Sequence, residues 1–447
     1  MKSDIKERDS MYKLIISQLF YDGHQSVGVT LAQTLGLSHN PPPPSDKLFR
    51  LLSLAKQMGD DDAAKDGAAG GVSETSTTGL AAAGPGLDLE FDADIVPNTP
   101  EPSFYETIYM TTHKQPCRAA CFSHDGLLLA SGSHDCSIKI MDVEKIIAKE
   151  LREGVGGGAT LGASSSGGDR PDPPDVNHPV IRTLYDHIDE VTCLAFHPRE
   201  QLIASGSSDF TLKFFDFSKM AVKRAKRTIF EVEPLRCLSF HPTGEYILVG
   251  TQHPTLRLYD VETASCFVGC VPTDQHKAAL NDVNYSENAR LFVTGSRDGD
   301  VKVWDAVSNR CIETFTRAHD GAEICSAVFT RNGKYILTAG RDSQVKLWEL
   351  AANRCLIAYT GAGQTGQMDL RIPAAFNHTE DYVLLPDEKS GSLCSWDARN
   401  ADRKRLLALG HVAPVRAFAH SPTQPAFVTG SDDNRVRFWY KRMSAQG

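Results

Sequence analysis

The chain has 447 residues, 41% of them hydrophobic and 23% charged. This length exceeds one ordinary hydrophobic core, so two domains or a repeat architecture is expected. The formal net charge is −9, but residues 1–104 carry 8 Lys/Arg against 15 Asp/Glu, whereas the remainder carries 39 against 41. The nearly neutral remainder argues against a strong nucleic-acid-binding domain, because that affinity depends on clustered Lys and Arg.

Eleven cysteines are scattered along the chain without a CxxC pair. This usage predicts reduced thiols in a cytosolic or nuclear protein, with no metal site and no bound cofactor. The N-terminal MKSDIKERDSMYK is charged, and no apolar run approaches the roughly 18 residues of a membrane span. Neither a secretory signal nor a membrane association is therefore expected.

Residues 1–58 are predicted to form a small helical domain. The stretch ERDSMYKLIISQLFYDG places an apolar surface on one helix, and further helices are expected over 26–36 and 45–58. So small a unit rarely has a sufficient core of its own, so it must pack on the rest of the chain or on a second copy. The sequence favours a symmetric homodimer. The predicted dimerisation residues are Met11, Leu14, Ile15, Leu19 and Phe20.

Residues 59–103 are predicted to be a linker, because GDDDAAKDGAAGGVSETSTTGLAAAGPG has too few apolar residues to order itself. Within it, LDLEFDADI (87–95) alternates apolar and acidic residues. The interpretation we favour is a solvated acidic tether. The alternative is a segment that packs along the following domain.

From residue 104 to 442 the chain repeats, and residues 443–447 form a short tail. One position in each repeat is aromatic or large and apolar, and it holds all four tryptophans of the chain. After Phe215 this position recurs at intervals of 44, 45, 44, 48 and 43 residues. Such a period with several short strands is typical of a WD-type β-propeller blade, so seven positions predict a mainly β, seven-bladed propeller. The seven are Met141, Phe215, Tyr259, Trp304, Trp348, Trp396 and Trp439.

Five repeats also share a histidine, a hydroxyl residue and an aspartate at constant offsets from that position. The aspartate stands six residues before it, the hydroxyl four residues before the aspartate, and the histidine 22 or 23 residues before the aspartate. The five sets are His113, Ser131 and Asp135; His187, Ser205 and Asp209; His276, Thr294 and Asp298 with Trp304; His319, Thr338 and Asp342 with Trp348; and His411, Thr429 and Asp433 with Trp439.

These residue types could suggest a Ser-His-Asp hydrolase, but a catalytic triad occurs once per active site and this set occurs five times. We interpret the sets as structural hydrogen-bond networks inside blades and predict no catalytic residue. Two repeats depart from the pattern. The third has Val249 and His253 at the hydroxyl and aspartate positions, and the sixth has Ser390 without an upstream histidine. We expect those two blades to depend on apolar packing.

The last repeat provides three strands of its blade, so a fourth must come from elsewhere. The β-rich TIYMTTH (107–113) is predicted to pair beside residues 435–441 and close the ring, which removes exposed sheet edges. VIRTLYDH then becomes the outer strand of the first blade. The Gly/Ser/Pro-rich insert at 152–175 is expected to be a disordered loop before it.

Partner contacts are expected on the propeller face formed by the loops before each first strand and the turns after each second strand. The candidate residues on this face are Lys114, Asp189, Arg297, Asp320, Arg341 and Asp432.

Several stretches resemble a specific family, the WD-repeat subunits of cleavage stimulation factor. They include YKLIISQLFYDG, GLDLEFDAD, HPVIRTLYDHIDEVTCLAFHP, ILVGTQHPTLRLYD and AFNHTEDYVLLPDE. The resemblance covers both domains and fails only in the 59–86 linker and the 152–175 insert. It implies a nuclear, non-catalytic scaffold that homodimerises through its N-terminal unit and docks the large helical-repeat subunit of the complex. It also implies a link to the C-terminal domain of RNA polymerase II, with RNA read by another subunit.

Two alternatives use weaker signals. WDAR (396–399) fits the WDxR box by which some propellers dock on a cullin-type ubiquitin ligase adaptor, although Arg399 also fits a solvated loop charge. LIISQLFYDGHQSVGVTLAQTLG resembles a LisH dimerisation motif, which would suit another LisH/WD scaffold.

Overall fold

The computed structural model describes residues 13, 15–19, 29, 31, 45, 86–89, 97, 99–155, 178–219, 223–363 and 373–441. The chain divides into two compact units, residues 1–79 and 80–447. In the first unit, Ile16 and Ser17 are buried, and the Ser45 N–H donates to the Ser17 carbonyl (3.0 Å). Of the predicted dimerisation residues, Ile15 and Leu19 are helical and partly buried, whereas Met11, Leu14 and Phe20 lie outside the described residues.

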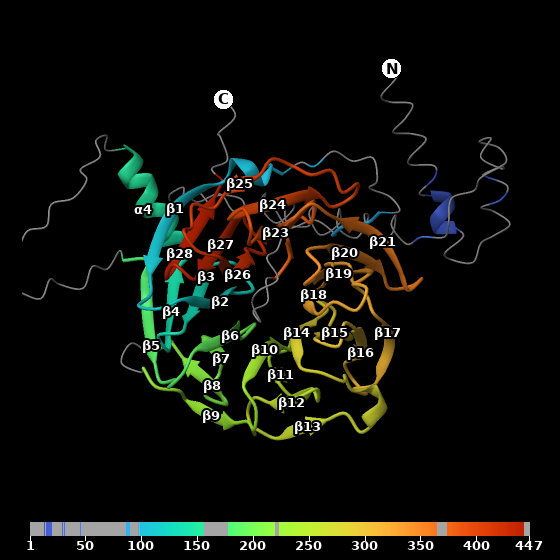
Figure 1. Cartoon of the computed structure of the whole chain (residues 1–447), viewed down its shortest axis with the longest axis horizontal. Coiled ribbons are helices and arrows are strands. Elements are labelled where there is room, and N and C mark those ends of the chain that lie inside the picture. Colours follow the sequence, from blue (N-terminus) through green and yellow to red (C-terminus); the bar gives the residue numbers. More distant parts are fainter. Residues whose placement is uncertain are drawn as a thin grey trace, which may run out of the picture. The chain divides into compact units, whose positions relative to one another are not determined.

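The second unit is a ring of seven four-stranded antiparallel sheets, so the prediction of a seven-bladed propeller is confirmed (Figure 1). Blade 1 contains β2 (Cys117–Phe122), β3 (Leu128–Ser133), β4 (Ser137–Asp142) and β5 (Val180–Tyr185). Blade 2 contains β6 (Val191–Phe196), β7 (Leu202–Ser207), β8 (Thr211–Asp216) and β9 (Arg227–Phe230). Blade 3 contains β10 (Leu235–Phe240), β11 (Tyr246–Thr251), β12 (Arg257–Asp260) and β13 (Cys266–Val268). Blade 4 contains β14 (Leu280–Tyr285), β15 (Leu291–Ser296), β16 (Val301–Asp305) and β17 (Cys311–Phe315).

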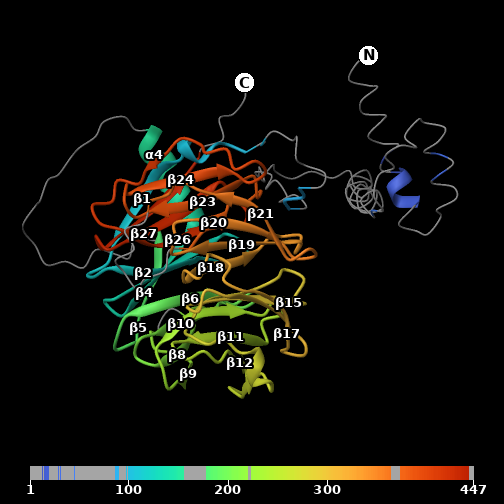
Figure 2. The same ribbon diagram turned by 45° about the vertical axis from the view of Figure 1, so that its right-hand side comes forward.

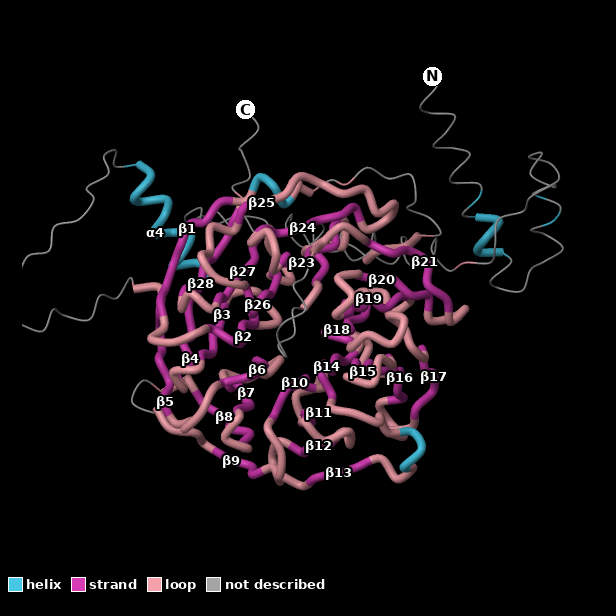
Figure 3. Tube along the Cα trace, in the orientation of Figure 1, coloured by secondary structure: helices cyan, strands magenta, loops and turns pink. Residues whose placement is uncertain are grey.

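The remaining blades complete the ring. Blade 5 contains β18 (Ile324–Phe329), β19 (Tyr335–Gly340), β20 (Val345–Glu349) and β21 (Arg354–Tyr359). Blade 6 contains β22 (Ala375–Phe376), β23 (Tyr382–Asp387), β24 (Ser392–Asp397) and β25 (Leu407–Ala408). Blade 7 contains β26 (Val415–His420), β27 (Ala426–Ser431), β28 (Arg435–Tyr440) and β1 (Glu106–Thr112). Short 3₁₀ turns cover Pro102–Phe104 and Pro272–Asp274. The tube in Figure 3 shows how strand dominates this unit.

The ring closes as expected, because β1 pairs antiparallel with β28. Tyr109 lies opposite Phe438, and Thr111 lies opposite Val436. The second strand of each blade, such as β7 with pattern LIASGS, is almost fully buried, because sheets pack against it on both sides. Short apolar strands of this kind therefore form the core between blades, and the outer strands carry most of the exposed residues.

A helix that the sequence analysis missed, α4 (Val143–Val155), follows β4. Asp142 Oδ1 accepts the Lys145 N–H (3.1 Å), as an N-cap residue does, and Val143 and Ile146 are buried against blades 1 and 7. Lys, Glu, Leu and Ala are good helix formers, so this local preference extends the helix through Val155. The prediction of an irregular insert from residue 152 is therefore wrong for 152–155. Residues 156–175 lie outside the described residues.

The C-terminal part of the predicted linker packs on the propeller, so the prediction of a solvated tether is wrong there. Leu87 is fully buried among the side chains of blades 5 and 6. Its N–H donates to Glu380 Oε2 (2.7 Å), and its carbonyl accepts the Asn332 side-chain amide (2.6 Å). The described residues 86–89 therefore form a strap on the turns between the first and second strands of these blades. Figure 2 shows the strands of blades 5 and 6 after a 45° rotation from the view of Figure 1.

Candidate functional site

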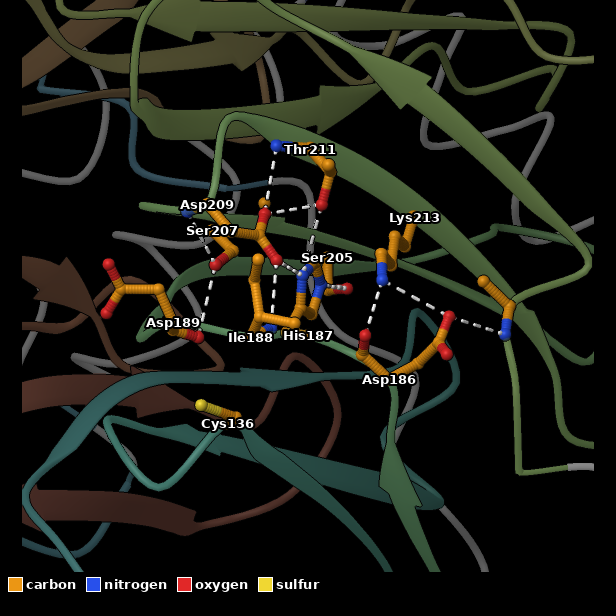
Figure 4. Close-up of polar contacts among 12 residues, drawn as sticks. Cys136, Asp186, His187, Ile188, Asp189, Ser205, Ser207, Asp209, Thr211 and Lys213 are labelled. Carbon is orange, nitrogen blue, oxygen red and sulfur yellow. Dashed lines mark hydrogen bonds and ion pairs between the residues drawn. The ribbon is translucent and has the colours of Figure 1, made fainter.

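The five predicted polar sets lie inside five blades and form buried hydrogen-bond networks. In blade 2, His187 Nε2 lies 2.7 Å from Ser205 Oγ, and His187 Nδ1 lies 2.8 Å from Asp209 Oδ2. Figure 4 shows how these side chains converge on the turn between β7 and β8. The same contacts recur in blades 4, 5 and 7, where the histidine lies 2.7–2.9 Å from the hydroxyl and 3.0 Å from the aspartate.

Three of these networks include a tryptophan. The indole Nε1 of Trp304, Trp348 and Trp439 donates to the threonine hydroxyl of the same blade at 2.9, 2.9 and 3.0 Å. Met141 and Phe215 occupy this position in blades 1 and 2, so the hydrogen-bond network of each of these blades ends at the hydroxyl group. In blade 1, His113 Nδ1 lies 3.0 Å from Ser137 Oγ and farther, at 3.4 Å, from Asp135 Oδ2.

In blades 1, 2, 4 and 7 the hydrogen-bond networks lower the pKa of the aspartate. Burial raises the pKa of Asp209, but hydrogen bonds from His187 and Thr211 outweigh burial and hold it below its usual range. The pKa values of Asp135, Asp298 and Asp433 are lowered in the same way, and the histidine of the same blade is among the hydrogen-bond donors. A carboxylate with such donors fixes the histidine ring and the turn around it.

The networks are unsuited to nucleophilic catalysis, because no substrate can reach the hydroxyls. Ser131, Ser205, Thr294, Thr338 and Thr429 are each 0% exposed. An attacking oxygen must approach its substrate closely, so these hydroxyls are structural groups. No group of three or more His, Cys, Asp or Glu side chains in the described parts of the chain is placed to hold a metal ion.

Blade 3 has a different polar network, so the expectation that it depends on apolar packing is wrong. Tyr259, at the tryptophan position, donates from its hydroxyl to Glu231 Oε1 (2.6 Å). Arg257 Nη1 pairs with Glu231 Oε2 (2.8 Å). Burial, and then the Glu231 carboxylate, raise the pKa of Tyr259. The sequence signal was the spacing, because Glu231 stands 22 residues before His253, at the place where the five blades with the repeated set have histidine.

Blade 6 replaces the hydroxyl by a main-chain carbonyl. The Trp396 indole Nε1 donates to the Thr360 carbonyl (3.0 Å), and the Gly363 N–H donates to Asp387 Oδ1 (3.1 Å). The Thr360 carbonyl therefore satisfies the buried indole nitrogen of blade 6 without a histidine. Arg399 of the WDAR box is 9% exposed at its side chain and pairs with Asp381 (2.8 Å), so it is not the solvated charge that the sequence suggested.

The six candidate partner-face residues lie in equivalent loops. Lys114, Asp189 and Asp320 are in loops that enter first strands, and Arg297, Arg341 and Asp432 are in turns between second and third strands. These connections lie at the same end of an antiparallel four-stranded sheet, so they share one face, which we call the turn face. The strap residues 86–89 contact the opposite face.

Much of the charge on the turn face is paired within the propeller. Arg297 and Arg341 both approach Glu323 Oε2, at 3.3 and 3.4 Å. Asp432 bonds to Arg118 of blade 1 and to Arg416 Nε (3.2 Å), which also reaches Glu388 of blade 6 (2.8 Å). Asp320 stays 91% exposed at its side chain. The ion pairs therefore join blades 6, 7 and 1 across the closure of the ring.

The repeated networks and the seven sheets define a WD-repeat β-propeller protein. The WD-domain G-beta repeat model matches residues 105–142, 179–216, 227–260, 269–305, 309–349 and 403–440, and it passes over 350–402, which hold most of the divergent blade 6. A second family model, cleavage stimulation factor subunit 1 dimerisation domain, matches residues 3–60.

Relatives identify the family within this class. The chain is 33% identical to cleavage stimulation factor subunit 50 of Arabidopsis thaliana over 336 residues, which is 75% of this chain and 73% of the relative. It therefore belongs to the family of WD-repeat cleavage stimulation factor subunits. The chain is 31% identical to nuclear distribution protein nudF of Emericella nidulans over 137 residues, which is 30% of each chain. It is 29% identical to periodic tryptophan protein 2 of Arabidopsis thaliana over 164 residues, which is 37% of this chain and 17% of the relative.

None of the helices in the described parts of the chain combines the length and apolar character needed to cross a bilayer. The eleven cysteines all lie in the described ranges and form no disulfide with one another, and Cys266, Cys270 and Cys355 are exposed.

Proposed function

We propose that this chain is a nuclear, non-catalytic scaffold subunit of a cleavage stimulation factor complex, which supports cleavage and polyadenylation of pre-mRNA 3′ ends. One observation carries the proposal: the dimerisation-domain match at residues 3–60 and the 33% identity to cleavage stimulation factor subunit 50 occur in one chain. The inaccessible hydroxyls support a scaffold rather than an enzyme, because the repeated polar groups are engaged in holding strands together.

In this proposal the N-terminal unit pairs two copies of the chain, and each propeller docks the large helical-repeat subunit. Two linked copies raise the effective concentration of every docked partner, so weak contacts act together. RNA contact is indirect, through another subunit, because the propeller region is nearly neutral, with 39 Lys/Arg against 41 Asp/Glu after residue 104. The C-terminal domain of RNA polymerase II is a further candidate partner.

The turn face is the proposed docking surface, and charge reversal tests it. Arg297→Glu with Arg341→Glu should weaken co-purification of the large subunit, because two positive charges near Glu323 become negative. The thermal midpoint should change little, since these pairs are partly exposed and such pairs contribute only about 0–1 kcal/mol. Arg290→Glu is the matched control, because Arg290 is exposed in the turn between β14 and β15 at the opposite face. Unchanged recovery of the large subunit with the double variant would refute this surface.

The function itself is tested by removing the chain from a nuclear extract that cleaves and polyadenylates a reporter pre-mRNA. Cleavage should fall and should return when the purified chain is added back. Full cleavage after removal would contradict the proposal.

A further inference from the structure

Four large apolar side chains are exposed together at blade 2 of the turn face. Ile188 is 86% exposed, Phe210 44%, Phe230 79% and Val232 81%. We call these four residues the blade 2 patch. Large exposed apolar groups that gather in one place mark interaction sites more often than single exposed residues do.

Hydrogen bonds and strand pairing bring the four residues to one turn. The Ile188 N–H donates to Asp209 Oδ2 (3.1 Å), next to Phe210. The Glu231 N–H donates to the Phe210 carbonyl (2.7 Å), and Glu231 stands between Phe230 and Val232. Phe230 also lies opposite Thr211 in the pairing of β8 with β9. Figure 4 shows Ile188 beside Asp209 at this turn.

Phe210 occupies a position whose backbone disfavours an aromatic residue. Its φ is 64°, in the left-handed region, where Gly and Asn are least strained. The equivalent turns have Cys136 (φ 64°) in blade 1, Gly299 (φ 83°) in blade 4, Ser343 (φ 66°) in blade 5 and Asn434 (φ 67°) in blade 7, so a left-handed residue is a regular feature of this turn. Phe210 is the largest residue among these five turns, and it is nearly half exposed.

The charges beside the patch are acidic. Asp189 follows Ile188 and is exposed, and Glu233 follows Val232 and is partly exposed. Glu231 is held by Arg257 and Tyr259. Apolar anchors within an acidic rim are complementary to a segment that carries apolar side chains flanked by lysine or arginine.

We propose that the blade 2 patch docks a short partner segment with two or more large apolar side chains flanked by basic residues. The inference rests on the proposed function, under which another subunit of the complex supplies this segment. Phe210 and Phe230 are its main anchors, because exposed aromatic residues near the centre of an interface contribute most of the binding energy.

The test is a calorimetric titration of the full-length chain with the purified large subunit. Phe210→Asn should weaken binding by about tenfold or more, as loss of an anchor does, while the thermal midpoint stays equal or rises because strain is relieved. Phe230→Ser should weaken binding similarly. Ser343→Asn is the matched control, since Ser343 has φ 66° in the equivalent turn of blade 5, and it should leave the affinity unchanged. Glu233→Lys should also weaken binding.

The outcomes separate this inference from the proposed function. If the wild-type chain does not bind the large subunit, both are overturned. If it binds and the Phe210→Asn and Phe230→Ser variants bind equally well, the blade 2 patch is not the docking site and the proposed function stands. If Phe210→Asn instead converts a dimer into a monomer in light scattering, the patch binds a second copy of this chain and the assignment to a basic partner segment is wrong.

Discussion

A single threonine hydroxyl has two buried partners in blades 4, 5 and 7. In blade 4 the Trp304 indole donates to Thr294, and the Asp298 carboxylate can only accept from His276 Nδ1. In the neutral imidazole with its proton on Nδ1, His276 Nε2 is an acceptor, and the Thr294 hydroxyl donates to it across 2.7 Å. The donors therefore point in one direction, from the indole to the carboxylate, and every member is satisfied.

Thr294→Val should be clearly destabilising, because it leaves buried nitrogens of Trp304 and His276 without a partner. Each buried polar group left unpaired costs about 1–3 kcal/mol. Thr294→Ser keeps the hydroxyl and should lose much less. Urea unfolding followed by tryptophan fluorescence measures the difference, and equal stability of the two variants would show that the network contributes nothing.

Two stacked histidines make the fold sensitive to acid. His378 and His420 lie with ring centroids 5.7 Å apart and nearly parallel planes, between blades 6 and 7. Burial, and then Arg331, lower the pKa of His378 from 6.5 to about 4, and burial, and then His378, lower that of His420 to about 3. Between these values and 6.5 the unfolded chain binds more protons than the folded chain, so stability falls as pH decreases.

The thermal midpoint should therefore decrease as the pH is lowered from 7 to 4.5. His378→Phe should flatten this dependence, because one of the two neutral histidines is gone. His253→Asn is the control, since His253 is exposed and its variant should follow the wild-type curve. A wild-type midpoint independent of pH over this range would contradict the explanation.

At the scale of elements, β1 closes the ring by main-chain pairing with β28. The His113 N–H donates to the Asn434 carbonyl (2.8 Å), and N–H groups alternate along a strand. The Thr111 N–H therefore faces β28, whereas that of Met110 faces away.

Thr111→Pro should open the closure and lower the thermal midpoint by many degrees, because proline removes a bond of the ladder. Met110→Pro, one residue away, should be tolerated much better on this edge strand. Thermal unfolding with light scattering measures both stability and edge-driven aggregation. Equal effects of the two substitutions would mean that closure does not depend on this pairing.

The strap residues 86–89 are the second element with a testable role. Leu87→Asp should be destabilising by roughly 2–3 kcal/mol, the value of one buried leucine, and should increase hydrogen exchange at residues 330–335 and 377–382. Asp88→Asn is the matched control, because it keeps the size of the side chain and removes the charge of a partly exposed ion pair with Lys334 (2.8 Å), a kind of pair that contributes little. An unchanged exchange pattern with Leu87→Asp would refute the packing role.

At the scale of the whole molecule, the N-terminal unit is expected to determine the oligomeric state. Light scattering of the full chain should give twice its 48.8 kDa mass, and a chain that begins at Leu80 should give a monomer. Ile15→Glu should weaken the dimer, whereas Lys13→Glu, an exposed position on the same helix, should not. A shorter propeller fragment from residue 104 would lack the strap and is a poor comparison. A monomeric full chain at micromolar concentration would contradict the dimer.

The sequence by itself determined the seven blades, the closure by residues 107–113 and the residues of the five networks. Those features depend on a local period and on constant offsets, which repetition makes visible. The tertiary structure decided what substitutes in the divergent blades, where Glu231 and Tyr259 replace one network and the Thr360 carbonyl replaces another. It also decided that Leu87 is buried and that Phe210 is strained and exposed. These outcomes depend on contacts between residues far apart in the chain and on backbone angles. Neither the contacts nor the angles can be read from the type and position of a single residue.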